Sequence, residues 1–281
     1  MPDYLNIAWD QLESVRRTAP LVHNITNFVV MHTTANALLA LGASPVMAHA
    51  CEEMEEISSL ASALVLNIGT LSPAWVEGMR LAQAAANAAG RPVVIDPVGA
   101  GASSYRTQTA LDLLRACAKN ASRTILRGNA SEIAALAGSG VRSKGVDSSL
   151  KAHEAGQAAS DLALEHGCLV CVSGAVDLVT DGKHMVRLTG GSPLMTRVTG
   201  MGCTATAVCA AFAAVAFTDG ADNNDDLRLA PVVSAMAVMS AAGGLAAKGC
   251  AGPGSFLIAF LDRLYSLSRA ELADNIRIEK L

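Results

Sequence analysis

The sequence is poor in aromatic and charged residues. Of its 281 residues, 4% are aromatic and 16% are charged, whereas 51% are hydrophobic. The 21 lysines and arginines are scattered along the chain, and the formal net charge is −4. Proteins that bind nucleic acids carry a positive patch for the phosphate backbone, so we expect no nucleic-acid partner.

Features of exported and membrane proteins are also missing. The first residues, MPDYLNIAWD, contain neither a basic segment nor an apolar run, which argues against a secretory signal. Two apolar stretches, residues 203–217 and 230–247, are rich in small residues, and the first is shorter than the ~20 residues that a membrane span needs. We therefore expect two core helices in a cytoplasmic protein that does not contact a membrane.

Seven cysteines, an odd number, lie inside apolar stretches. Cys168 and Cys171 form a CxxC pair, a pattern that often marks a redox or zinc site. Here the pair lies in GCLVCVSG, which has the composition of a buried strand, and side chains three apart on a strand point to opposite faces. The two thiols then cannot hold one metal ion, and we expect reduced core cysteines.

Short β-rich segments alternate with helical segments along the chain. We expect strands at residues 62–69, 91–99, 123–129 and 168–174, and helices at 73–90, through 110–120, at 130–136 and at 148–166. The strands are continuously apolar, as burial on both faces of a parallel sheet requires. This pattern predicts an α/β fold, a three-layer α/β/α sandwich with a mostly parallel central sheet and helices on both faces, in a single domain over residues 1–281.

Two other segments refine this prediction. Residues 177–188 are typical of a hairpin with Asp181 and Gly182 at its turn, which predicts an antiparallel edge to the sheet. An eight-stranded barrel is the main alternative architecture. Because the last ~80 residues have a mostly helical pattern, an open sheet is favoured.

Polar residues follow several of the expected strands, where open α/β sheets bind their ligands. Asp96 follows one strand, Arg127 and Glu132 follow or end the next, and Ser173 ends a third. Asp96 and Glu132 would suit Mg²⁺ beside a phosphate, and the fork of Arg127 suits phosphate oxygens. The two carboxylates could instead be solvated loop residues or helix caps.

The segment VTGMGC, residues 198–203, ends a loop at the expected start of a helix. Unpaired amides and the helix dipole favour an anion at such a point, and Gly200 and Gly202 let the backbone approach it closely. A tight strand-to-helix connection also explains these glycines. The dinucleotide pattern GxGxxG and the Walker pattern GxxxxGK[ST] are both absent.

Together these motifs resemble the hydroxyethylthiazole kinase family, which has the ribokinase-like fold. The resemblance rests on PLVHNITNFVVMHTTANALLALGASPVMAHA, LVLNIGTL, VIDPVGAGAS, ILRGNASEI, VSGAVDLVTDG and VTGMGC, in this order. It implies ATP-dependent phosphorylation of the hydroxyl of 4-methyl-5-(2-hydroxyethyl)thiazole, with Mg²⁺, in thiamine biosynthesis or salvage. It also implies a homotrimer with the thiazole site at a subunit boundary.

The resemblance further implies a role for individual residues. Met47, Gly200 and Asn24 are assigned to the thiazole, Arg127, Ser173 and Gly202 to ATP, Asp96 and Glu132 to the metal, and Cys203 to catalysis. Related sugar kinases usually have Asp at the position of Cys203. Our hypothesis is that the Cys203 thiol is the group nearest the attacking hydroxyl. The alternative is that Cys203 is only a small residue at the helix start and takes part in no proton transfer. A helix N-terminus lowers a thiol pKa and bound ATP opposes that effect.

Other functions are compatible with the same fold. NAD(P)H-hydrate dehydratases share it but usually carry Asp in a GxGD motif, where this chain has GMGC. Hydroxymethylpyrimidine kinases share it without HNITN and SPVMAHA. A non-catalytic binder of nucleotides or thiamine precursors would not need the metal and phosphate residues together.

Overall fold

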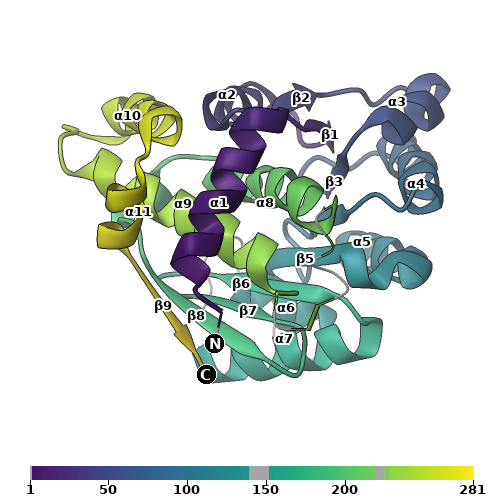
Figure 1. Ribbon diagram of the computed structural model, residues 1–281. Coiled ribbons are helices and arrows are strands. Elements are labelled where there is room, and N and C mark those ends of the chain that lie inside the picture. Colours follow the sequence, from purple (N-terminus) through teal and green to yellow (C-terminus); the bar gives the residue numbers. More distant parts are fainter. Residues whose placement is uncertain (1, 139–151, 219, 221–223, 226) are drawn as a thin grey trace.

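Nine strands form one sheet in this computed structural model, which describes residues 2–138, 152–218, 220, 224–225 and 227–281. The strand order is β2-β1-β3-β4-β5-β6-β7-β8-β9 (Figure 1). The strands are β1 (Leu21–Ile25), β2 (Ser44–Val46), β3 (Ala63–Asn67), β4 (Val93–Asp96), β5 (Thr124–Asn129), β6 (Leu169–Ser173), β7 (Asp177–Thr180), β8 (Met185–Gly190) and β9 (Ile276–Lys280). Neighbours from β2 to β6 pair in parallel, and those from β6 to β9 are antiparallel.

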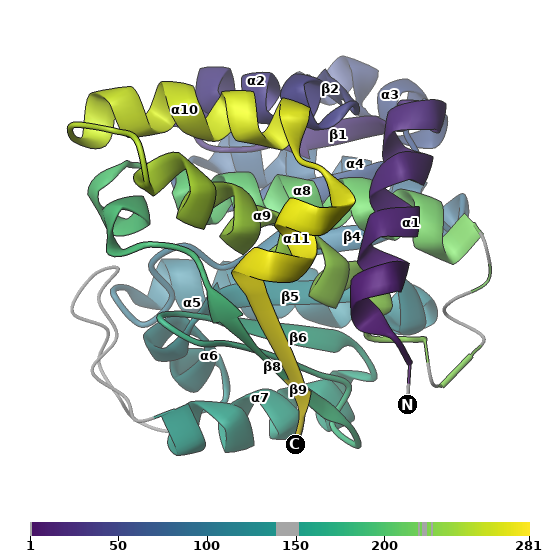
Figure 2. The same ribbon diagram turned by 60° about the vertical axis from the view of Figure 1, so that its left-hand side comes forward.

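Helices cover both faces of the sheet (Figures 1 and 2). The core on one face is built with α1 (Tyr4–Thr18), α2 (Met31–Leu41), α8 (Met201–Thr218), α9 (Ala230–Ala247), α10 (Pro253–Ser266) and α11 (Arg269–Asn275). The core on the other face is built with α3 (Met54–Leu60), α4 (Pro73–Ala88), α5 (Ser104–Ala116), α6 (Ala130–Leu136) and α7 (Ala152–His166). The predicted three-layer α/β/α arrangement is therefore confirmed.

The central strands are buried on both sides because their side chains alternate between these two cores. In β3, Ala63 and Val65 contribute to the core under α8, whereas Leu64 and Leu66 contribute to the core under α4. This is why such strands are apolar without interruption. The CxxC pair follows the same rule, since Cys171 lies in the core under α8 and Cys168 lies in the opposite core.

Helix α8 runs through the interior of the protein. Every residue from Thr204 to Phe217 is buried. By length and composition α8 and α9 are apolar enough to cross a membrane, but 83% of each apolar window is buried inside the protein. Both are therefore explained as core helices. In the first turn of α8, Gly202 is exposed, whereas Met201 and Thr204 are buried.

Most segments predicted from the pattern are present, including the hairpin of β7 and β8, in which Gly182 has φ +90°. The helix expected over residues 148–166 is found from Ala152, and residues 148–151 lie outside the described part of the chain. The last ~80 residues are not wholly helical, because β9 adds an antiparallel strand to β8. Its short IRIEK segment follows a helix directly and carries three charges, so the pattern did not mark it.

We expect Phe212→Ala in α8 to cost about 3–5 kcal/mol in the free energy of unfolding, because it removes a large side chain from a dense core. Phe212 is 0% exposed, and its side chain is part of the core between α8 and its neighbours. Urea denaturation followed by circular dichroism measures the loss.

The matched control is Tyr265→Ala in α10, where the aromatic side chain is 75% exposed. This change should stay within about 0.5 kcal/mol of wild type. Equal losses in the two variants would contradict the central place of α8 in the core.

Candidate functional site

Polar side chains gather on the α8 side of the sheet, at the carboxyl ends of three neighbouring strands. Asn67 ends β3, Asp96 ends β4 and Arg127 lies in β5. The residues two positions earlier in these strands, which are Val65, Val94 and Ile125, lie in the core under α8. Because side chains alternate along a strand, these three polar residues face α8 as well. Asn67 and Asp96 are paired neighbours in the parallel ladder.

A chain of hydrogen bonds links Asp96 to Cys203 at the start of α8. Oδ2 of Asp96 accepts hydrogen bonds from Asn67 Nδ2 at 2.7 Å and from Thr206 Oγ1 at 2.8 Å. Oδ1 of Asn67 accepts a bond from Asn27 Nδ2 at 2.9 Å, and the same nitrogen lies 3.3 Å from the sulfur of Cys203. Strands β3 and β4, the loop after β1 and helix α8 therefore meet in one polar cluster.

The VTGMGC loop turns sharply into α8. Gly200 has φ +83°, and a Cβ there would lie 2.5 Å from Cγ1 of Val30, so this position requires glycine. The amide of Thr204 donates to the carbonyl of Gly200 at 2.8 Å. The amides before it have no acceptor within the helix, and Gly202 among them is exposed. A helix start of this kind attracts anions.

The Arg127 guanidinium lies directly under this first turn. A Cβ built on Gly202 would be 3.3 Å from Nη1 of Arg127, whose side chain is buried. Burial by itself lowers the pKa of Arg127, but the negative charges of Asp96 and Asp177 contribute to raising it overall. The guanidinium therefore stays charged and adds to the positive potential at the helix start.

Glu132 lies at the start of α6 and is held by two main-chain amides. Its Oε1 accepts from Gly99 N at 2.8 Å, and its Oε2 accepts from Asn129 N at 2.9 Å. The side chain of Asn129 caps the same turn by accepting from Glu132 N. Burial, followed by the charge of Asp96, raises the pKa of Glu132 to about 7.

The two carboxylates fit a magnesium site. Burial also raises the pKa of Asp96, and its repulsion with Glu132 is what a bound cation would relieve. The part of the chain that the structure describes contains no group of three or more His, Cys, Asp or Glu placed to hold a metal. Mg²⁺ commonly takes one or two carboxylates and completes its shell with phosphate oxygens and water, so two carboxylates are enough.

The Cys203 thiol is partly exposed, but its pKa does not follow the effect expected at a helix start. Burial, and then the charge of Asp96, raise the pKa of Cys203 to about 12, although the amides of Asn67 and Asn27 oppose the shift. In the protein without nucleotide the sulfur is therefore protonated at neutral pH.

The remaining predicted residues lie at different distances from this cluster. Asn24 is fully buried, and its Nδ2 donates to the carbonyl of Val22 at 2.8 Å, so its side chain bonds within its own strand. Met47 follows β2 directly and is partly buried. Ser173 ends β6, and its hydroxyl is 3.4 Å from the carbonyl of Gly128. The roles assigned to these three residues stay predictions.

Sequence reasoning missed several residues of the cluster. Asn27 and Asn67 were not selected, although Asn27 lies in HNITN and Asn67 ends a strand as Asp96 does. Arg106 was missed as well. Its guanidinium donates to the carbonyls of Ile68, Val98 and Gly69 at 2.7–2.9 Å, which ties together the loops after β3 and β4.

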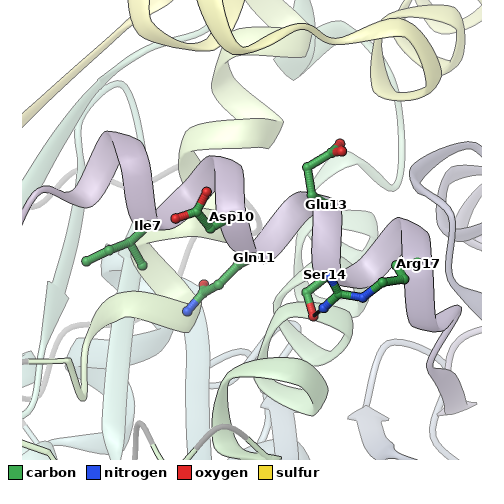
Figure 3. Close-up of a pocket in the computed structure, with 6 residues that line it drawn as sticks. All are labelled: Ile7, Asp10, Gln11, Glu13, Ser14 and Arg17. Carbon is green, nitrogen blue, oxygen red and sulfur yellow. Dashed lines mark hydrogen bonds between the residues drawn. The ribbon is translucent and has the colours of Figure 1, made fainter.

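Two grooves in the described surface lie away from the cluster. One follows α1, as Figure 3 shows, and is lined by Ile7, Asp10, Gln11, Glu13, Ser14 and Arg17. The other lies between α4 and α5 and includes Tyr105. Neither contains a residue that the sequence assigned to the site.

Asp177 provides a pH test of the buried charges. Burial raises its pKa to about 6, although the amide of Gly174 and the charge of Arg127 oppose the shift. The unfolded chain releases this proton near its ordinary pKa of 3.8, whereas the folded protein keeps it until about 6. Relative to Asp177→Asn, wild type should therefore lose about 3 kcal/mol of stability as pH rises from about 4 to 6.

Denaturant titrations of both proteins across this pH range measure the difference. Asparagine keeps an acceptor for Gly174 N, so the local turn is preserved. A stability difference that stays constant with pH would contradict a raised pKa at Asp177.

Comparisons with known proteins agree with this geometry. The hydroxyethylthiazole kinase of Nitratidesulfovibrio vulgaris (strain Miyazaki F) is 55% identical over 270 residues, which cover 96% of each chain. The solved structure of a hydroxyethylthiazole kinase protein from Pyrococcus horikoshii superposes with a TM-score of 0.86 at 40% identity, covering 98% of this chain and 99% of that one.

More distant structures share only the fold. The pyridoxal kinase of Staphylococcus aureus superposes with a TM-score of 0.63 at 17% identity, covering 94% of this chain and 99% of that one. A ribokinase-like superfamily protein from Enterococcus faecalis superposes with a TM-score of 0.58 at 13% identity, covering 89% of this chain and 87% of that one, and the predicted ribokinase-like fold is therefore confirmed. The family model of the hydroxyethylthiazole kinases matches residues 12–270, and the chain therefore belongs to the hydroxyethylthiazole kinase family.

Proposed function

We propose that this protein transfers the γ-phosphoryl group of ATP to the hydroxyl of 4-methyl-5-(2-hydroxyethyl)thiazole, in thiamine biosynthesis or salvage. The products are the phosphate ester, ADP and the proton of the hydroxyl. The observation that carries the proposal is the exposed start of α8 beside Asp96 and Cys203, in a chain of this family.

The start of α8 is the proposed phosphoryl site. The transition state of phosphoryl transfer is largely dissociative, so catalysis comes mostly from positioning and from stabilising charge. The amide of Gly202 and the guanidinium of Arg127 beneath it supply that charge at one point. Ser173, at the end of β6, is proposed to contact the nucleotide beside them.

Asp96 and Glu132 are proposed to hold Mg²⁺. When bound, the cation would neutralise charge on the phosphates. Asp96 is kept in one orientation by Asn67 and Thr206, and Glu132 by two main-chain amides, so neither carboxylate has to reorganise. This pre-organisation supports their assignment to the metal.

Cys203 is proposed to lie nearest the attacking hydroxyl. Because the pKa of its thiol is raised to about 12, the sulfur serves mainly to orient the alcohol in the ground state. In a dissociative transition state little charge builds on the attacking oxygen, so the hydroxyl needs only weak assistance in losing its proton. The roles of Met47, Gly200 and Asn24 toward the thiazole are proposed from the family motifs.

We propose that the protein acts in the cytoplasm as a homotrimer with the thiazole site at a subunit boundary. Exposed apolar residues next to the cluster support a covering partner. Phe28 and Val29, directly after Asn27, are 63% and 64% exposed. The buried ring of Trp75 supports this surface from beneath, with its centroid 4.8 Å from that of Phe28 and 4.2 Å from that of His49.

The substrate is tested by ADP release with ATP and Mg²⁺. We expect turnover with hydroxyethylthiazole and only background rates with hydroxymethylpyrimidine, and no dehydration of NADH hydrate. Turnover confined to the pyrimidine would replace the proposed substrate, and dehydration of the hydrate would replace the reaction class.

The role of Cys203 is tested by two substitutions. Cys203→Ala should lower kcat by about 10- to 100-fold, because an oriented partner of the hydroxyl is lost while the charge of the site remains. Cys203→Asp should remain active, since a carboxylate can replace the thiol as the partner. Steady-state kinetics measures both.

Cys250→Ala is the matched control, because Cys250 is also partly exposed but its sulfur points to the carbonyl of Ala247, at 3.7 Å, and not to a residue of the cluster. This variant should keep the wild-type rate. A wild-type rate in Cys203→Ala as well would contradict the proposed role of the thiol in orienting the hydroxyl.

A further inference from the structure

Two buried carboxamides connect the proposed metal ligand to the proposed catalytic thiol. Asn67 is 0% exposed and Asn27 is 4% exposed, and neither is among the residues assigned to the substrates, the metal or catalysis above. Asn67 contacts Asp96, and Asn27 contacts Cys203. We call Asn27 and Asn67 the amide pair.

Main-chain amides fix the direction of both side chains. Gly69 N, which can only donate, lies 2.9 Å from Oδ1 of Asn67. Val29 N lies 3.1 Å from Oδ1 of Asn27. Each oxygen is therefore committed to a backbone donor, and each Nδ2 must point the other way.

The direction matters most at Asp96, because an ionised carboxylate can only accept hydrogen bonds. Nδ2 of Asn67 donates to Asp96 at 2.7 Å, and Nδ2 of Asn27 is directed at the sulfur of Cys203 at 3.3 Å. Asn27 also donates to Asn67 at 2.9 Å, so the two amides act on each other as well. Reversing Asn67 would set its Oδ1 against the carboxylate of Asp96, and reversing Asn27 would remove the donor that now faces the sulfur of Cys203.

Gly69 leaves the space that the amide pair occupies. A Cβ at residue 69 would lie 2.7 Å from Nδ2 of Asn27, a distance that real side chains do not tolerate. The loop after β3 therefore supplies both the donor for Asn67 and the space for Asn27. The close contact between Asn27 and this loop therefore requires glycine at position 69.

We infer that Asn27 and Asn67 are positioning residues for phosphoryl transfer. Asn67, together with Thr206, fixes the orientation of the Asp96 carboxylate by donating to its Oδ2. Asn27 fixes the sulfur of Cys203 at the mouth of the site. The inference rests on the proposed function for the reaction that it serves.

The same sheet carries a matched control at its other edge. Asn120 and Asn87 also form a carboxamide pair, with Asn120 Nδ2 at 3.4 Å from Asn87 Oδ1 and at 2.6 Å from the carbonyl of Arg91. Asn120 is 7% exposed and precedes β5, at the amino ends of the strands. Asn120→Ala therefore reports the structural cost of removing a buried amide away from the site.

The first experiment compares Asn67→Ala, Asn67→Asp and Asn120→Ala in steady-state kinetics and urea denaturation. Both Asn67 variants should lower kcat by about 10- to 100-fold with KM for the alcohol within about threefold of wild type. Asn67→Asp keeps the acceptor for Gly69 N but replaces the donor toward Asp96 with an acceptor, so it should not rescue the rate. Asn120→Ala should lose stability and keep kcat.

Either of two results would overturn the role of Asn67. One is a wild-type kcat in Asn67→Asp, which would mean that the direction of the donor is irrelevant. The other is an equal fall of kcat in Asn120→Ala, which would make the effect a general loss of structure.

The second experiment measures ADP binding by calorimetry, without the alcohol and without turnover. Mg²⁺ should strengthen ADP binding to wild type, and Asn67→Ala should reduce that gain about tenfold while the affinity in EDTA stays unchanged. An unchanged gain would contradict the link between Asn67 and Asp96. Because no thiazole is present, this result stands even if the proposed substrate proves wrong.

The third experiment places Asn27→Ala in wild type and in Cys203→Ala. If Asn27 acts through the sulfur, its substitution should lower kcat at least fivefold in wild type and less than twofold where the sulfur is already absent. Equal losses in both backgrounds would show that Asn27 does not act through Cys203.

Discussion

A buried charge cluster of Arg127, Asp96 and Asp177 lies at the carboxyl ends of the sheet, with the Arg127 guanidinium against the start of α8. Arg127 lies under Gly202, and its charge is coupled to those of Asp96 and Asp177. Burial raises the pKa of both carboxyls, so their ionised forms depend on the guanidinium. Breaking such a cluster from one side leaves an uncompensated charge in the interior. The ends of β4 and β5 and the start of β7 are therefore coupled through one set of charges.

The apolar body of α8 gives this arrangement its rigidity. Because the helix is buried from Thr204 to Phe217, its first turn cannot move without disturbing the core. The positive φ of Gly200 sets the direction in which the chain enters α8 at Met201. Amide dipoles, the guanidinium and the carboxylates are thus fixed before any ligand arrives, which is the condition under which electrostatic stabilisation is most effective.

Local sequence patterns predicted much of the fold and part of the site. Uninterrupted apolar runs marked the central strands, and VTGMGC marked the start of α8, because each depends on neighbours along the chain. Asn27 and Asn67 could not be selected in this way, since one asparagine in a strand end has no distinctive pattern and its importance comes from a partner 40 residues away. The Cys203 pKa was also beyond local reasoning, because burial and the charge of Asp96, which raise it, come from the tertiary structure. Asn24 was selected by its motif; its side chain bonds within its own strand, and its role toward the thiazole stays a prediction.

The central claim is that the start of α8 binds the phosphoryl group that is transferred. A crystal structure of the protein with a non-hydrolysable ATP analogue and Mg²⁺ tests it most directly. The account predicts the γ-phosphate within hydrogen-bond distance of the Gly202 amide, with the cation between the phosphates and Asp96. A triphosphate bound along another part of the sheet edge, away from Gly202, would contradict it.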